Sequence, residues 1–268
     1  MTIHPLCALT IAGSDSGGGA GIQADLKTFA AHGVHGLSAI AALTAQNTRG
    51  VSAVHVPPVA FVRAQIDACF DDFRIGAVKL GMLATADVIH AVADALESHR
   101  PPFVVLDPVM VATSGARLLA EDALDAMRTR LLPLATVLTP NIPEAELLLD
   151  HPIENGYAAD TAVAGLRALG PNAVLLKGGH LDEGQTIVDR YDDGRIDARF
   201  THDRIAVDGH GTGCTLASAI TANLCRGLPL QDACAAAIDY VFAALSQGYR
   251  AGDSGIVVLD HFGARPSR

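Results

Sequence analysis

Three alternating glycines stand near the C-terminal end of the chain, in the run Asp208-Gly-His-Gly-Thr-Gly-Cys214, directly before an alanine-rich helical pattern. Glycines let the backbone turn tightly and leave its N–H groups uncovered. A helix that begins there adds unpaired amides and the positive end of its dipole. The segment therefore predicts a cradle for an anion such as phosphate, with Gly211, Thr212 and Gly213 as its turn, although an ordinary helix start would show the same pattern. Cys214 falls in the first turn, where a thiol pKa tends to be lowered.

A second glycine-rich segment, residues 13–21, carries five glycines in nine residues between an apolar run and a helical pattern. Its spacing fits neither the dinucleotide-binding fingerprint nor the P-loop. It indicates either a backbone that closes around a small ligand or a flexible turn. Asp25 follows on the helix and is interpreted either as a partner for a polar ligand group or as a solvated helix residue.

Polar side chains follow other apolar runs. Gln46 offers one acceptor and two donors, which suits the edge of an aminopyrimidine ring, although a plain polar turn would also contain it. Asp107 and Glu144 follow neighbouring runs and predict a Mg²⁺ site, with helix capping around Asn141 as the alternative. Lys177 ends a later run and is expected to reach a phosphate.

These residues need a sheet to bring them together, and the chain alternates short apolar runs with amphipathic stretches. The predicted strands are Leu6–Ala12, Ser38–Leu43, Ala77–Leu80, Phe103–Leu106, Thr136–Thr139 and Ala173–Leu176, with Thr186–Tyr191 and Ile196–Phe200 as an antiparallel hairpin. This order predicts an α/β fold in which helices sandwich a mostly parallel sheet with a small antiparallel edge. The polar stretch 149–160 is interpreted as a surface loop, and residues 1–268 as one domain. All the candidate residues then fall at the carboxyl ends of strands, where such sheets bind ligands.

The bulk composition restricts the partners. A formal net charge of -10 argues against nucleic acid and against anionic membranes, and no apolar run is long enough to span a bilayer. Five cysteines without CxxC spacing argue against a disulfide framework or a zinc site. We therefore expect a cytoplasmic protein without a leader peptide that acts on a small molecule, and we expect it to be a homodimer.

Several motifs occur in an order that covers nearly the whole chain. They are Ala8–Asp15, Gly18–Phe29, Leu43–Thr48, Lys79–Leu83, Leu106–Ala112, Leu138–Asn141, Leu176–His180 and His210–Leu216. Together they closely resemble the hydroxymethylpyrimidine/phosphomethylpyrimidine kinase family of thiamine biosynthesis. The resemblance implies a ribokinase-like three-layer α/β/α sandwich that uses ATP and Mg²⁺. It implies phosphorylation of 4-amino-5-hydroxymethyl-2-methylpyrimidine and then of its monophosphate to the diphosphate, in a chain without an appended thiamine-phosphate synthase segment.

The resemblance also assigns roles by matching position. The residues expected around the pyrimidine are Gly13, Asp25, Gln46, Met82 and Val109. It places Cys214 where many relatives carry a catalytic Asp, and makes Gly211, Thr212 and Gly213 the anion hole. It assigns Glu144 to Mg²⁺ and Lys177 to phosphate.

The chain departs from the family pattern at a few positions. Ser16-Gly17 replaces Pro-Ser, and Gly209 replaces Thr or Asn. Thr113 and Ile238 stand where lysine is frequent, so fewer cations balance phosphate charge. Two other functions remain open at this point: a pyridoxal kinase, which Gln46 and Met82 disfavour, and a catalytically silent pyrimidine-binding protein, which would lack the anion hole or the Mg²⁺ groups.

Overall fold

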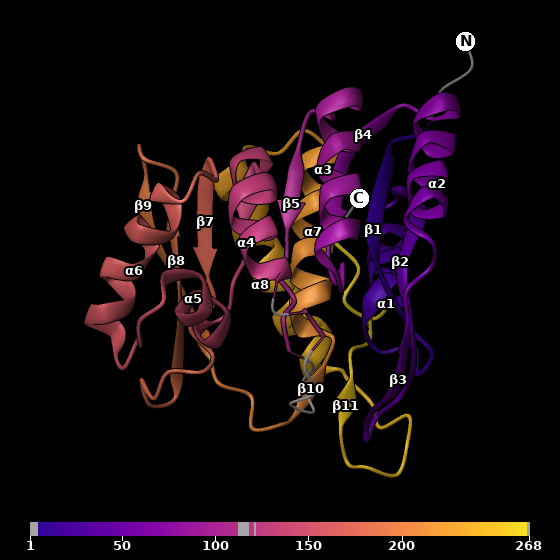
Figure 1. The fold of residues 1–268 in the computed structure, drawn as a ribbon. Helices are drawn as coiled ribbons and strands as arrows, with labels where there is room; N and C mark the ends of the chain where they lie inside the picture. Colours follow the sequence, from indigo (N-terminus) through magenta and orange to yellow (C-terminus); the bar gives the residue numbers. More distant parts are fainter. Residues whose placement is uncertain (1–4, 112–117, 121, 267–268) are drawn as a thin grey trace.

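A nine-stranded sheet runs through the centre of the chain (Figure 1). The computed structural model describes residues 5–111, 118–120 and 122–266, so Thr113 lies outside the described residues. The strand order is β3-β2-β1-β4-β5-β6-β7-β8-β9. The parallel strands are β1 (Cys7–Asp15), β2 (His35–Asn47), β4 (Ile75–Leu80), β5 (Val104–Leu106), β6 (Val137–Leu138) and β7 (Ala173–Leu176). All six predicted parallel strands are confirmed.

Antiparallel strands form both edges of the sheet. The predicted hairpin is confirmed as β8 (Thr186–Asp192) and β9 (Asp197–Asp203), which follow β7 at one edge. The other edge is β3 (Gly50–His55), which pairs antiparallel with β2 and was not predicted. A separate short pair joins β10 (Gly209–His210) to β11 (Val257–Val258) in the lower part of the molecule as drawn in Figure 1.

Helices cover both faces of the sheet, which confirms the three-layer arrangement (Figure 1). The helices are α1 (Gly21–Ala31), α2 (Val59–Asp72), α3 (Ala86–His99), α4 (Ala123–Ala126), α5 (Ile142–Leu149), α6 (Gly156–Ala168), α7 (Thr212–Cys225) and α8 (Leu230–Ser246). One π turn (Met127–Leu131) and one 3₁₀ turn (Leu132–Leu134) extend α4. Helices α2 to α6 share one apolar core with the sheet, whereas α1, α7 and α8 pack on the opposite face. Helix α6 corrects the interpretation of 149–160 as a loop, because Asn155 caps a helix that starts at Gly156.

The central strands are apolar because both of their faces are covered. Every residue of β1 is buried except Ser14, which is partly buried. The register of β1 against β2 shifts between Ala12 and Gly13, where the glycine-rich segment begins. This irregularity bends the chain at the carboxyl edge of the sheet, a common position for bulges next to functional sites.

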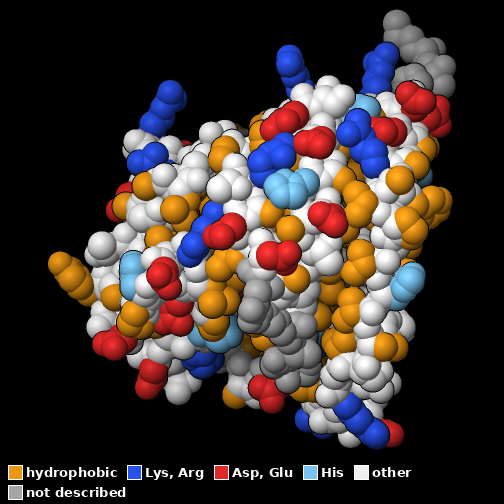
Figure 2. Space-filling view, viewed as in Figure 1, with side chains coloured by type: hydrophobic (Ala, Val, Ile, Leu, Met, Phe, Trp, Pro, Cys, Tyr) orange, Lys and Arg blue, Asp and Glu red, His pale blue; other side chains and the backbone are white. Residues whose placement is uncertain are grey.

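On the surface shown in Figure 2, acidic, basic and apolar side chains are interspersed. No helix among the described residues is both long enough and apolar enough to cross a membrane.

Candidate active site

A cavity of about 490 Å³ opens at the carboxyl ends of the parallel strands. Open α/β sheets bind their ligands at this edge. The predicted site residues that line it are Gly13, Gln46, Met82, Asp107, Val109, Glu144, Lys177, Gly211, Thr212, Gly213 and Cys214. The fold therefore brings together every predicted site residue except Asp25.

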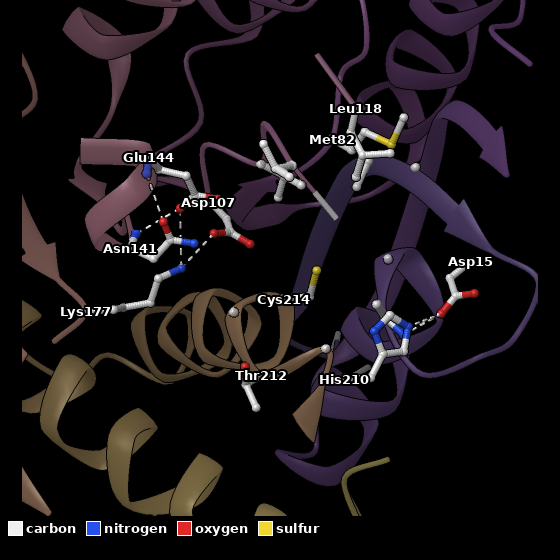
Figure 3. A pocket seen from close by; sticks show the side chains of 18 of the residues that line it. Asp15, Met82, Asp107, Leu118, Asn141, Glu144, Lys177, His210, Thr212 and Cys214 are labelled. Carbon is white, nitrogen blue, oxygen red and sulfur yellow. Dashed lines mark hydrogen bonds and ion pairs between the residues drawn. The ribbon is translucent and has the colours of Figure 1, made fainter. Parts of the chain in front are cut away.

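The glycine turn before α7 forms one wall of the cavity. Gly211 precedes the helix with a φ of +86°, and a Cβ there would collide with the carbonyl group of Gly19. Only glycine meets both conditions without strain. No described side chain caps α7, so the first N–H groups of the helix remain available to an anion. In Figure 3, Thr212 and Cys214 mark this end of α7.

Cys214 does not have the lowered thiol pKa that its place in the first helical turn predicted. Burial, reinforced by the nearby carboxylates of Asp107 and Asp25, raises its pKa to about 11. The Lys79 ammonium and the backbone N–H of Gly21 act in the opposite direction but are outweighed. The prediction is corrected because desolvation of the thiolate costs more than the helix terminus returns. Cys214 is thus a thiol near neutral pH.

Lys177 lies between two carboxylates on the opposite wall of the cavity (Figure 3). Its Nζ is 3.2 Å from Asp107 Oδ1 and 3.9 Å from Glu144 Oε2. Burial alone would lower the pKa of this ammonium, but the two carboxylates raise it above its ordinary value. A Cβ on Gly213 would lie 3.2 Å from the same Nζ. Lys177 Nζ and the Asp107 carboxylate therefore both lie close to the glycine turn, and a side chain at position 213 would contact them.

Glu144 has two functions in the structure. It completes a capping box, since its Oε2 accepts a hydrogen bond from the N–H of Asn141 while Asn141 Oδ1 accepts one from the N–H of Glu144. The capping alternative is therefore correct, and it coexists with exposure of the carboxylate to the cavity. Burial, reinforced by Asp107, raises the pKa of Glu144 to about 7 against the opposing effect of Lys177.

The donor set suits a divalent cation that is also bound by phosphate. Two carboxylates share one Lys177 ammonium, so the group carries an excess of negative charge that a cation would relieve. Hard carboxylate oxygens are the ligands that Mg²⁺ prefers, and it usually binds through one or two of them plus substrate phosphates. Within the described residues no three His, Cys, Asp or Glu side chains form a self-sufficient metal cluster. A cation held by these carboxylates would take its remaining ligands from water or from a bound ligand.

Asp25 is the predicted site residue that does not line the cavity. Its side chain is fully buried, 3.0 Å from Lys79 Nζ, and it accepts hydrogen bonds from the hydroxyls of Thr10 and Ser218. Asp25 was expected to contact the ligand directly, and this expectation is wrong. Asp25 pairs with Lys79 instead, and it is Lys79 that lines the cavity. Although burial opposes its charge, Asp25 raises the pKa of the Lys79 ammonium. A Cβ on Gly81 would lie 2.7 Å from Lys79 Nζ, so the Lys79-Leu-Gly81 spacing makes room for the ammonium.

The other residues predicted to surround a pyrimidine form a mostly apolar wall. Met82 is largely buried, and its Sδ would lie 3.0 Å from a Cβ on Gly13. Val109 packs against the same small cluster as Met82. Gln46 lies near the end of β2 and contributes a polar group to the cavity. Apolar side chains combined with a few polar groups are the kind of surface that holds a flat heteroaromatic ring.

Sequence reasoning missed one pair, Asp15 and His210, which lines the cavity opposite Lys177 (Figure 3). His210 Nε2 lies 2.9 Å from Asp15 Oδ2, and both side chains are largely buried. The Asp15 carboxylate accepts hydrogen bonds from the backbone N–H groups of Gly17, Gly19 and Ala20. An Asp followed by Ser-Gly-Gly-Gly was the available signal, because such a carboxylate readily bonds to the next backbone amides.

A family model described as phosphomethylpyrimidine kinase matches residues 15–258 of the chain. A hydroxymethylpyrimidine/phosphomethylpyrimidine kinase of Rhizobium meliloti is 52% identical over 246 residues, which cover 91% of each chain. A thiamine biosynthesis bifunctional protein of Geobacter sulfurreducens is 51% identical over 238 residues, and the match spans 88% of this chain but 48% of that protein.

Two solved structures are similar over most of the chain. An ADP complex of Bacillus subtilis pyridoxal kinase superposes with a TM-score of 0.89 at 33% identity, covering 98% of this chain and 99% of the other. A phosphomethylpyrimidine kinase of Clostridium difficile gives a TM-score of 0.79 at 42% identity, covering 88% and 97%.

Proposed function

The chain belongs to the phosphomethylpyrimidine kinase family, with a ribokinase-like fold, and from that premise we propose how its site works. The reaction is the ATP-dependent phosphorylation of 4-amino-5-hydroxymethyl-2-methylpyrimidine, and then of its monophosphate to the diphosphate, in thiamine diphosphate biosynthesis. One observation carries the assignment of the site: a single cavity joins a ring-sized wall that contains Gln46 to an anion-binding turn that faces Lys177. Residues 1–268 act as one kinase domain, because the sheet continues from β3 to β9.

Phosphoryl transfer requires alignment and charge neutralisation more than covalent participation by the protein. The N–H groups of Gly211 to Cys214 bind the transferring phosphoryl group as its charge spreads over the equatorial oxygens. Lys177 neutralises phosphate from the opposite wall. The substrate oxygen forms the new P–O bond while the bond to ADP breaks, and the hydroxyl proton passes to Cys214 in its thiolate form, which is the minor form near neutral pH.

Asp107 and Glu144 would hold Mg²⁺ at this site. When bound, the ion supplies positive charge to the phosphate oxygens of ATP. The protein's own contribution is to keep the two carboxylates at the edge of the cavity, with the Glu144 carboxylate fixed by the N–H of Asn141. Lys177 partly neutralises both carboxylates and thereby makes their close approach tolerable.

A pyridoxal kinase activity is the second candidate, because the fold superposes closely on such an enzyme. Gln46 and Met82 in the ring wall favour the pyrimidine. A silent binding protein is disfavoured, since the open glycine turn and both carboxylates are present.

The test is ADP release coupled to a reporter, measured separately with the aminopyrimidine alcohol, its monophosphate and pyridoxal. We expect turnover with the first two and a much lower kcat/KM with pyridoxal. If only pyridoxal were turned over, the protein would be a pyridoxal kinase and the proposed pyrimidine substrate would be wrong. Calorimetric binding of the pyrimidine without ADP release from any acceptor would identify a binding protein instead.

We also propose a homodimer that works in the cytoplasm. Val54 and Phe61 are exposed apolar side chains on β3 and α2 at one edge of the sheet, which suits a partner surface. The five cysteines are all unpaired, as in reducing compartments. Size-exclusion chromatography with light scattering tests the oligomeric state, and the mass of a monomer would reject the proposed dimer.

A further inference from the structure

The side-chain amide of Gln46 lies between two neighbours that together determine its orientation. On one side, Thr44 Oγ1 is 3.0 Å from one terminal atom of the amide, placed as Oε1, and 2.9 Å from the carbonyl oxygen of Ser14. On the other side, His210 Nε2 is 3.3 Å from the second terminal atom of the amide. The backbone of Gln46 is also fixed, because its N–H and C=O both bond to the Ser16 hydroxyl.

The proton on His210 follows from its other partner. Asp15 is an ionised acceptor: although burial would raise its pKa, the His210 hydrogen bond and the backbone N–H groups hold it below its ordinary value. A carboxylate can only accept, so the Nε2 atom that faces it at 2.9 Å must carry the hydrogen. His210 Nε2 therefore has no lone pair to offer Gln46, and its one hydrogen is shared between the Asp15 carboxylate at 2.9 Å and the Gln46 amide at 3.3 Å.

The amide of Gln46 must then present its oxygen to His210, because two N–H groups facing one another would repel. The amide nitrogen faces Thr44 in this orientation. Thr44 has one hydroxyl hydrogen, which goes to the Ser14 carbonyl, and its oxygen accepts an N–H from Gln46. Every donor in the chain Asp15, His210, Gln46, Thr44, Ser14 then meets an acceptor.

We propose that His210 is a positioning and specificity residue, which orients the Gln46 amide so that the site reads a 4-aminopyrimidine and rejects its 4-oxo analogue. This inference rests on the proposed role of Gln46 in ring recognition. The orientation leaves Gln46 one N–H and one oxygen lone pair for a ligand. A 4-aminopyrimidine offers a ring nitrogen that accepts and an amino group that donates. The 4-oxo ring offers a ring N–H and a carbonyl, which is the reverse pattern.

Discrimination therefore depends on preventing the amide from rotating by 180°. A rotated amide would match the 4-oxo ring as well as the present orientation matches the 4-amino ring. Hydrogen-bond mismatches in a desolvated site are among the strongest sources of substrate discrimination. Without the N–H of His210, the site keeps its shape but loses the group that excludes the rotated amide.

The experiment measures kcat/KM for the 4-amino alcohol and for its 4-oxo analogue, and takes their ratio for each variant. We expect His210→Phe to lower that ratio at least about tenfold. His210→Gln, which restores a donor of similar reach, should recover part of the ratio. His180→Phe is the matched control, since His180 lines the same cavity without contacting Gln46 in any hydrogen bond of the described residues. It should leave the ratio unchanged whatever it does to turnover.

Thr44→Val provides the same test if His210→Phe fails to fold, because it removes the partner on the other side of the amide and keeps the side-chain shape. It should also lower the ratio. Gln46→Leu should remove most of the discrimination, and adding His210→Phe to it should change the ratio no further. A wild-type ratio in His210→Phe and Thr44→Val, with a lost ratio in Gln46→Leu, would overturn the inference alone. A wild-type ratio in Gln46→Leu would overturn the proposed recognition role of Gln46 together with it.

Discussion

The thiol of Cys214 provides the sharpest test of the chemistry, because its pKa of about 11 lies far above the pH at which the kinase is expected to work. A pH of 8 is three units below this pKa, so about one molecule in 1,000 carries a thiolate at that pH. If the thiolate accepts the hydroxyl proton, the single-turnover rate should rise about tenfold per pH unit between pH 7 and pH 10. The rise should level off only near the pKa itself.

Two substitutions separate this role from a packing role. Cys214→Ser keeps the backbone amides but offers an acceptor that does not ionise in this range, so the rate should fall about 10²–10⁴-fold. Cys214→Asp supplies a carboxylate, which ionises at a lower pH than a thiol in the same surroundings, so its rate should level off at a lower pH than that of the wild type and should exceed that of Cys214→Ser. Cys69→Ser is the matched control, because Cys69 is a partly buried thiol on α2 that does not line the cavity.

The measurement is quenched-flow single turnover at saturating ATP, Mg²⁺ and pyrimidine, which isolates the chemical step from product release. A flat profile for the wild type, together with a rate in Cys214→Ser within a few-fold of it, would refute the proton-acceptor role. The turn would then act through its N–H groups alone.

Three further outcomes are expected. Lys79→Met should lower the free energy of unfolding by about 3–5 kcal/mol, because it leaves the Asp25 carboxylate buried without its cation. Adding Asp25→Asn should recover part of this loss, as measured by chemical denaturation. Equal stability of the single variant and the wild type would contradict the ion-pair argument. Gly213→Val should lower kcat more than 10²-fold with little change in melting temperature, since the side chain would crowd Lys177, and near wild-type kcat in this variant would contradict the crowding argument. Glu144→Gln should raise the Mg²⁺ concentration needed for half-maximal activity while pyrimidine binding without ATP stays normal by calorimetry, and an equal loss of activity at low and saturating Mg²⁺ would exclude the metal role.

The parallel strands could be predicted because both of their faces are buried, which leaves an apolar run as a direct signal. β3 has no such signal, since it is an edge strand whose residues from Ser52 to His55 are all exposed. Helix α6 resembles a loop in sequence because the mostly polar, proline-containing residues 150–155 precede it and its first residue is Gly156. Asn155, which caps this helix, is the one local signal that the sequence contains for its start.

The members of the site could be predicted for a different reason: polar residues that follow parallel strands must converge at one edge of the sheet. Their protonation and their contacts could not. The pKa of Cys214 depends on burial that the whole fold creates. Asp25 is buried in an ion pair with Lys79, which is 54 residues away in the chain and lines the cavity in its place. The Asp15–His210 pair joins residues 195 positions apart, a distance over which no local pattern carries information.

That long separation has a consequence for how activity arises during synthesis and for how the chain can be divided. The hairpin at Asp192 to Gly194 lies between the segment that carries Asp15 and Gln46 and the segment that carries His210 and the glycine turn. A nascent chain that has emerged only as far as this hairpin has most of the sheet but lacks the glycine turn that we propose binds phosphate, so we expect it to be catalytically inert whatever its degree of folding. Two fragments cut there should each be inactive and regain kinase activity only on association, which makes the hairpin a natural place for a split reporter.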